Sequence, residues 1–131
     1  SKIVDAALDR HPPSPSKPWS LIIYEDGVDP SDGLAKNHSR MSGVVYWAFA
    51  EYGLQALACE QMWGTITVCR NTEYKQLAGG MSQLFNQVLK LCFGDVHHLR
   101  RSGISVTLHN CREALIIGRA SILLADIPAL K

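Results

Sequence analysis

The chain has little of what marks several broad classes of protein. No apolar run approaches the roughly 18 residues of a membrane-spanning helix, and no charged-then-apolar segment of the secretory type opens the sequence. The 13 basic and 12 acidic residues give a formal net charge of +1, so no basic field of the kind typical of nucleic-acid-binding domains is expected. The composition therefore predicts an intracellular protein without a membrane span, in which any contact with nucleic acid is local.

Cysteine is also sparse. The chain has 4 cysteines, which form no C-x-x-C pair, and each lies in or beside an apolar segment: Cys59, Cys69, Cys92 and Cys111. Without such pairs, we expect these side chains to be buried, reduced thiols. Reduced thiols suit an intracellular compartment.

Length and hydrophobic content fit one domain with an N-terminal tail. A chain of 131 residues that is 47% hydrophobic should bury roughly two-thirds of its unfolded surface. Prolines crowd the segment from position 12 to position 18 and cannot join a helix or a central strand. We therefore predict a Pro-rich tail or linker over residues 1–18, with a short helix over Ile3–Leu8, and a domain over residues 19–131. Trp19 should anchor the end of the linker to the core.

The rest of the sequence is organised around a run that leads from Leu21 to Asp26. The run is apolar and rich in β-branched and aromatic residues until Glu25, which predicts a strand buried on both faces. Gly27 and Pro30 supply turn chemistry that should end it, so Asp26 is expected at the strand's end. Glu25 should face the other side of the sheet.

The remaining pattern predicts an α+β fold. A surface loop is expected over Val28–Ser42, and two short-connected strands after it would complete an antiparallel three-strand meander with the first. Apolar residues then recur at spacings of three and four from Asn71 to Gly94, which predicts one long helix. The strands expected after the first lie over Val44–Ala50, Trp63–Cys69, Gly103–His109 and Ala114–Ile117. Ala120–Leu124 should continue the last of these past a break at Gly118-Arg119, with the start of a helix as the alternative.

This order of elements allows two acids to meet. If the long helix crosses over and brings a later strand beside the first, the right-handed crossover rule makes the two strands parallel. Parallel neighbours end at the same edge of the sheet, so Asp26 and Asp126 would lie side by side. Two adjacent carboxylates suit Mg²⁺ or Mn²⁺. Alternatively, both acids are turn residues near unrelated strand ends.

Two short motifs carry a resemblance to a known family. Tyr24-Glu25-Asp26 and Ala125-Asp126-Ile127-Pro128 resemble motifs in the RNase H-like catalytic core of eukaryotic DNA transposases of the Plavaka and Kyakuja-Dileera-Zisupton type. In that core one apolar strand ends in a YSD-like acid and a later one in GD-[IN]-P. Ala125 replaces the usual glycine. The resemblance covers roughly Pro18–Lys131 in order.

The resemblance implies an RNase H-like mixed sheet, a nuclear setting, and divalent-metal-dependent nuclease and strand-transfer chemistry on DNA. Asp26 and Asp126 would be two of three metal-binding, catalytic acids, with Mg²⁺ or Mn²⁺ as the cofactor. The third acid and a zinc-binding segment would follow Lys131, so we expect the chain to be a fragment, truncated at the C-terminus and inactive alone.

Two other functions are compatible with the sequence. One is a non-catalytic α+β interaction or scaffold domain with no metal site, whose loops bind a partner. The other is a thiol- or histidine-based enzyme, although no local signature of such an enzyme is present. Its candidate residues would be the 4 cysteines together with His38, His97, His98 and His109.

Overall fold

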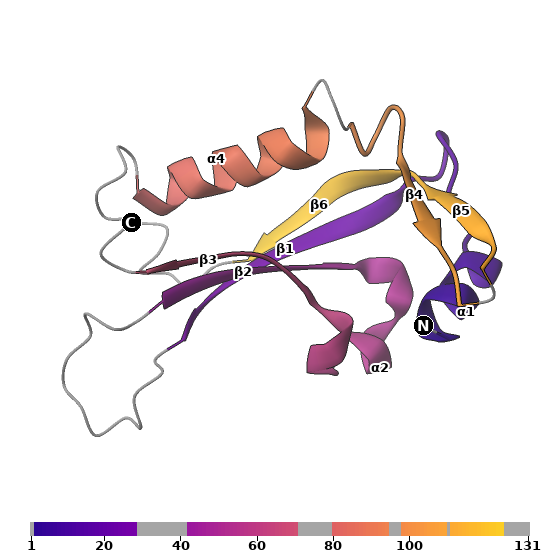
Figure 1. Ribbon diagram of the computed structural model, residues 1–131, viewed down its shortest axis with the longest axis horizontal. Helices are drawn as coiled ribbons and strands as arrows, with labels where there is room; N and C mark the ends of the chain where they lie inside the picture. Colours follow the sequence, from indigo (N-terminus) through magenta and orange to yellow (C-terminus); the bar gives the residue numbers. More distant parts are fainter. Residues whose placement is uncertain (1, 29–41, 71–79, 95–97, 110, 125–131) are drawn as a thin grey trace.

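The computed structural model describes residues 2–28, 42–70, 80–94, 98–109 and 111–124 (Figure 1). Most of the expected elements are present within these ranges. In chain order they are α1 (Lys2–Arg10), β1 (Trp19–Val28), β2 (Ser42–Phe49), the short 3-10 helix η2 (Ala50–Tyr52), α2 (Leu54–Leu57), the 3-10 helix η3 (Glu60–Met62), β3 (Gly64–Arg70), α4 (Gly80–Phe93), β4 (Ile104–Thr107), β5 (Glu113–Ile116) and β6 (Gly118–Leu124).

Four strands form one mixed sheet in the order β3-β2-β1-β6. β1 and β2 are antiparallel, and so are β2 and β3, which confirms the predicted meander. β6 lies parallel to β1 on its other side, which confirms that a strand late in the chain returns beside the first. The predicted α+β class is therefore correct, and β1 is an interior strand with both edges paired.

β1 is longer than the sequence indicated. The ladder with β2 runs from Leu21 opposite Phe49 to Val28 opposite Ser42, so Asp26 lies inside the strand, opposite Val44. The prediction that Gly27 ends the strand was wrong, because the ladder hydrogen bonds with β2 continue through this position and override the local turn preference. Against β6 the described pairing ends earlier, at Tyr24 opposite Leu124.

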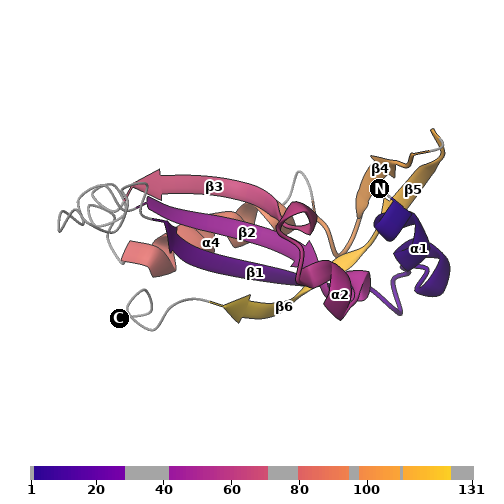
Figure 2. The ribbon, with the colours of Figure 1, turned by 90° about the horizontal axis from the view of Figure 1, so that it is seen from below.

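α4 covers one face of the sheet (Figures 1 and 2). Phe85 and Val88 of α4 are 4% and 2% exposed, and they belong to one core cluster with Leu21, Ile23 and Val45 of the sheet. The long amphipathic helix is confirmed over its described part. Its predicted start at residues 71–79 lies outside the described residues, as does most of the loop expected at positions 28–42.

Trp19 joins the N-terminal segment to this core. Its side chain is 1% exposed, and its indole Nε1 donates a hydrogen bond to the carbonyl oxygen of His11 at 2.6 Å. α1, which confirms the predicted short helix, buries Ala7 and Leu8 in the same cluster. The proline-rich segment between them therefore returns the chain to the domain, and Trp19 is the anchor that the sequence predicted.

β4 and β5 form a separate two-stranded antiparallel sheet. The turn between them includes Cys111, whose φ of 62° places it in the left-handed region. Leu108 donates its N–H to the carbonyl oxygen of Arg112 at 2.7 Å and closes this turn. The break between β5 and β6 falls at Ile117, one residue before the Gly118-Arg119 position where the sequence suggested it.

The expectation of buried cysteines was wrong in part. All four are free thiols, but Cys59 and Cys111 are exposed, while Cys69 and Cys92 are half-buried. Cys59 lies in the irregular connection between α2 and η3, and Cys111 lies in the turn before β5. Apolar neighbours along the chain do not set the direction of a side chain where the backbone is irregular, so sequence context misjudged these two.

The start of β6 is a packing-sensitive position. A Cβ added to Gly118 would lie 2.9 Å from Cδ2 of Leu99 and 3.1 Å from Cε1 of Phe49, and both neighbours are buried. Leu99 cannot retreat easily, since its carbonyl oxygen also accepts the N–H of Gly118 at 3.1 Å. We expect Gly118→Ala to lower the free energy of unfolding by about 1–3 kcal/mol, measured by urea denaturation.

The matched control is Ser121→Ala, which alters an exposed side chain on the same strand. It should stay within about 0.5 kcal/mol of the parent chain. Equal stability of the two variants would contradict the close packing of Gly118 against Leu99 and Phe49.

Candidate functional site

The two faces of β1 have different surroundings. Trp19, Leu21, Ile23 and Glu25 alternate along one face, and all four are buried. On the opposite face Ile22 is buried, whereas Tyr24 and Asp26 are half-exposed. The segment that contains α2 lies on the side of the sheet away from α4 (Figure 1). The period of two in β1 therefore sends Asp26 out of the core, toward this segment.

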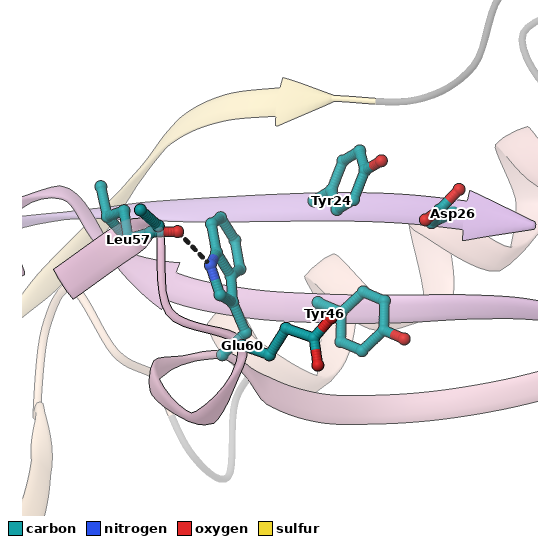
Figure 3. Close-up of a pocket in the computed structure, with 7 residues that line it drawn as sticks. Tyr24, Asp26, Tyr46, Leu57 and Glu60 are labelled. Atoms are coloured by element: carbon teal, nitrogen blue, oxygen red, sulfur yellow. Dashed lines mark hydrogen bonds between the residues drawn. The ribbon is translucent and has the colours of Figure 1, made fainter. Parts of the chain in front are cut away.

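A cavity of about 490 Å³ lies on this second face (Figure 3). Two strands of the sheet form one wall, and the connection between β2 and β3 forms the other. Its lining residues are Tyr24, Asp26, Tyr46, Leu57, Ala58, Glu60 and Trp63.

Three aromatic rings shape the cavity. Tyr24 and Tyr46 are directly opposite in the β1–β2 ladder, and their rings stack with centroids 6.3 Å apart and an interplanar angle of 21°. The ring of Trp63 lies 6.2 Å from that of Tyr24 and is tilted by 60°. Its Nε1 donates a hydrogen bond to the carbonyl oxygen of Leu57 at 2.9 Å, marked by the dashed line in Figure 3. That hydrogen bond ties the orientation of the indole to α2.

Two carboxylates accompany these rings. Asp26 is half-exposed and projects from β1, and Glu60 is exposed and extends from η3 toward Tyr46 in Figure 3. None of the lining residues that the structure describes is basic. The cavity thus combines aromatic and aliphatic surface with two acidic groups, a combination that favours a positively charged or metal ligand over an anion.

The structure places only one of the two predicted metal ligands. Asp26 lines the cavity, whereas Asp126 lies outside the described residues. Among the residues that the structure describes, no group of three or more His, Cys, Asp or Glu side chains is arranged to hold a metal ion. The last described pair of the β1–β6 ladder is Tyr24 with Leu124. Tyr24 precedes Asp26 by two positions, and Leu124 precedes Asp126 by two positions.

Glu25 is a buried charged residue of the described core, at 3% exposure. It pairs with Val45 across the β1–β2 ladder, and Val45 is fully buried. Because neighbouring residues of a strand project to opposite faces, Glu25 points away from the cavity that Asp26 lines. The prediction that Glu25 faces the other side of the sheet from Asp26 is therefore confirmed.

The surroundings of Cys92 and His98 do not favour nucleophilic activation. Burial raises the pKa of the Cys92 thiol, which is opposite to what a reactive thiolate needs. Nδ1 of His98 accepts the backbone N–H groups of Arg100 and Arg101, both at 3.2 Å, so this ring stabilises a turn. His38 and His97 lie outside the described residues.

Sequence reasoning missed the aromatic part of the site. Tyr46 and Trp63 were assigned to strands without a shared function, and Glu60 lies in a connection that shows no periodicity. The one available signal was the meander itself, because an antiparallel pairing of the first two strands places Tyr24 and Tyr46 close to one another.

Comparison of the chain with protein-family models, with curated proteins and with solved structures found no match. Among the described helices, none is both long and apolar enough to cross a membrane.

The buried Tyr52 and the half-buried Cys92 predict a loss of stability at alkaline pH. Burial raises the pKa of Tyr52 above its ordinary value of 10.0 and that of Cys92 above 9.0, because the charged forms are poorly solvated. The folded chain holds both protons more tightly than the unfolded chain does. The resulting stabilisation is complete below the ordinary pKa values and is lost as pH rises through the folded-state values.

We therefore expect the free energy of unfolding to fall between about pH 8 and about pH 11, and to fall less in Tyr52→Phe and Cys92→Ala. Urea denaturation across this range measures the slope. Cys59→Ala, which removes an exposed thiol, serves as the control and should keep the slope of the parent chain. An unchanged slope in the double variant Tyr52→Phe, Cys92→Ala would contradict this assignment.

Proposed function

We propose that this chain is part of an RNase H-like, divalent-metal-dependent DNA nuclease and strand-transfer core of the Plavaka and Kyakuja-Dileera-Zisupton transposase type. Asp26 and Asp126 are its metal-binding acids, and Mg²⁺ or Mn²⁺ is the cofactor. DNA is the partner, engaged through the whole protein, and the setting is the nucleus.

One observation carries the proposal. β1 and β6 are parallel neighbours, and their pairing brings Tyr24 opposite Leu124. Asp26 follows Tyr24 by two residues, and Asp126 follows Leu124 by two. Parallel neighbours lie about 4.8 Å apart. If the pairing of β6 with β1 continued for two more residues, the two acids would lie at the same height on one face of the sheet, because each follows a paired position by two residues.

The strand order supports the same fold. An antiparallel meander is followed by a helix on one face, and the chain then returns as a strand parallel to the first. The β1–β2 ladder, in which Asp26 lies opposite Val44, holds Asp26 on a rigid backbone, as a metal site requires. Its half-exposed side chain leaves room for water ligands, which Mg²⁺ retains in most protein sites.

The chemistry follows from the ligand type. Carboxylates are the ligands that Mg²⁺ and Mn²⁺ prefer, and such ions activate a water and stabilise the leaving oxygen in phosphodiester cleavage. The part played by this chain is to hold Asp26 and Asp126 at a fixed separation on the sheet. A third acid completes the set in the proposed family, so the chain alone should bind metal without cutting DNA.

A second candidate is a non-catalytic α+β interaction domain. The observation in its favour is the cavity beside Asp26, which is lined by Tyr24, Tyr46 and Trp63. Three rings are more than a carboxylate metal site needs, and such a lining is typical of binding surfaces. On this reading, replacing Asp126 leaves the chain's function unchanged.

Titration with Mn²⁺, followed by the loss of the free-ion electron paramagnetic resonance signal, tests the metal site. The parent chain should bind Mn²⁺, and Asp26→Asn and Asp126→Asn should each weaken binding by at least about tenfold, since each removes a direct ligand. The chain should show no nicking of supercoiled DNA in the same buffer.

Glu113→Gln is the matched control, because it removes one negative charge from an exposed position on β5. It should leave Mn²⁺ affinity unchanged. If the parent chain fails to bind Mn²⁺, or if both aspartate variants bind it as the parent does, the nuclease-core proposal is wrong and the interaction-domain reading is favoured.

A further inference from the structure

We propose that the cavity lined by Tyr24, Tyr46, Trp63 and Glu60 binds an alkylated ammonium group, the side chain of a methylated lysine on a partner protein. This inference stands independently of the nuclease proposal. The two share only Asp26, and the aromatic rings and Glu60 have no part in the proposed metal site.

The geometry of the three rings suits a weakly hydrated organic cation. A cation is attracted to the face of an aromatic ring when it lies within about 6 Å of the ring centre. The Tyr24–Tyr46 and Tyr24–Trp63 centroid distances of 6.3 and 6.2 Å bring the three rings close to one another. The 60° tilt of Trp63 against Tyr24 gives the cavity two aromatic surfaces that are not parallel, and a cation beside both rings would lie within reach of each.

The two carboxylates of the lining favour a ligand with a positive charge. Within the part of the chain that the structure describes, Glu60 and Asp26 are the charged residues of the lining, and no lysine, arginine or histidine accompanies them. A phosphate or a nucleic-acid backbone would meet two acidic groups and no basic one, which is unfavourable without a bound metal ion. An ammonium group would gain both ring and carboxylate attraction. Charge complementarity therefore selects a cation.

The aliphatic part of the lining favours a methylated cation over a free one. Leu57 and Ala58 contribute apolar surface beside the rings. The methyl groups of a quaternary ammonium make it less strongly hydrated than a primary ammonium, so less solvation is lost when it enters such a cavity. A cavity of about 490 Å³ lies within the range of small-molecule sites and accommodates the head group with part of its aliphatic stem.

The rings are held before any ligand arrives. The β1–β2 ladder places Tyr24 opposite Tyr46, and the hydrogen bond to the carbonyl oxygen of Leu57 orients Trp63. Binding therefore requires little ordering of the aromatic walls, which lowers its entropic cost. Glu60 is exposed and adjusts to the ligand.

The experiment titrates the chain, in buffer containing EDTA, with Nα-acetyl-trimethyllysine amide and follows the indole N–H resonances by NMR. The Trp63 resonance should shift with millimolar affinity. Choline should also bind, at least about fivefold more tightly than 3,3-dimethylbutan-1-ol, its uncharged analogue of the same shape. Nα-acetyl-lysine amide should bind more weakly than its trimethylated form.

Variants assign the effect to this cavity. Glu60→Gln should weaken trimethyllysine binding several-fold, and Tyr46→Leu should weaken it further, while thermal unfolding followed by circular dichroism confirms that both fold. Glu113→Gln, which removes an exposed charge elsewhere, should leave the affinity unchanged. Asp126→Asn should also leave it unchanged, although that variant removes a ligand in the nuclease proposal.

Three results would overturn the inference. The first is no shift of the Trp63 resonance up to about 20 mM ligand, well above a millimolar dissociation constant. The second is equal binding of choline and its uncharged analogue, which would make the cavity a simple apolar site. The third is binding of adenosine monophosphate in preference to trimethyllysine, which would identify a base-stacking surface. Because EDTA removes divalent ions, each of these results leaves the Mn²⁺ experiment to be judged separately.

Discussion

The structure depends on the pairing of β1 along both of its edges. β2 pairs with it in the antiparallel sense and β6 in the parallel sense, so the ladders take up the backbone polar groups that would otherwise have to reach water. With its backbone held in this way, β1 can bury one face beneath α4 and contribute the other to the wall of the cavity. The same strand thus supplies Leu21 and Ile23 to the core and Tyr24 and Asp26 to the cavity.

The register of β1 determines which of its side chains line the cavity. A shift of one residue in β1 would exchange the two faces and direct Glu25 into the cavity in place of Asp26. The register is specified by the hydrophobic pattern, because Trp19, Leu21 and Ile23 are nearly fully buried on the other side. The connection between β2 and β3 then closes the cavity through Trp63, whose indole is tied to α2. The proposed metal site and the proposed cation site therefore rest on the same alternation.

Sequence periodicity predicted the elements more reliably than their limits. The alternation of β3 and the apolar stripe of α4 identified a strand and a helix correctly, because each pattern follows the period of its own backbone. The sequence placed the end of β1 too early, at Gly27. The turn preference of this residue competes there with the ladder hydrogen bonds to β2, which cannot be read from β1 alone. Cys59 and Cys111 were misjudged for a related reason. Their exposure depends on backbone direction in irregular segments, which no periodic pattern records.

By itself, the sequence determined the α+β class, the meander, the amphipathic helix, the anchoring of Trp19 and the opposite orientation of Glu25 and Asp26. These follow from local periodicity and from the burial of large apolar side chains. Only the tertiary structure decided that Asp26 lies within β1, that Tyr24 stacks on Tyr46, and that Trp63 and Glu60 join them in one cavity. Those contacts join residues up to about forty positions apart. They depend on the strand register and on the path of an irregular connection, and no single segment of the sequence encodes either of these.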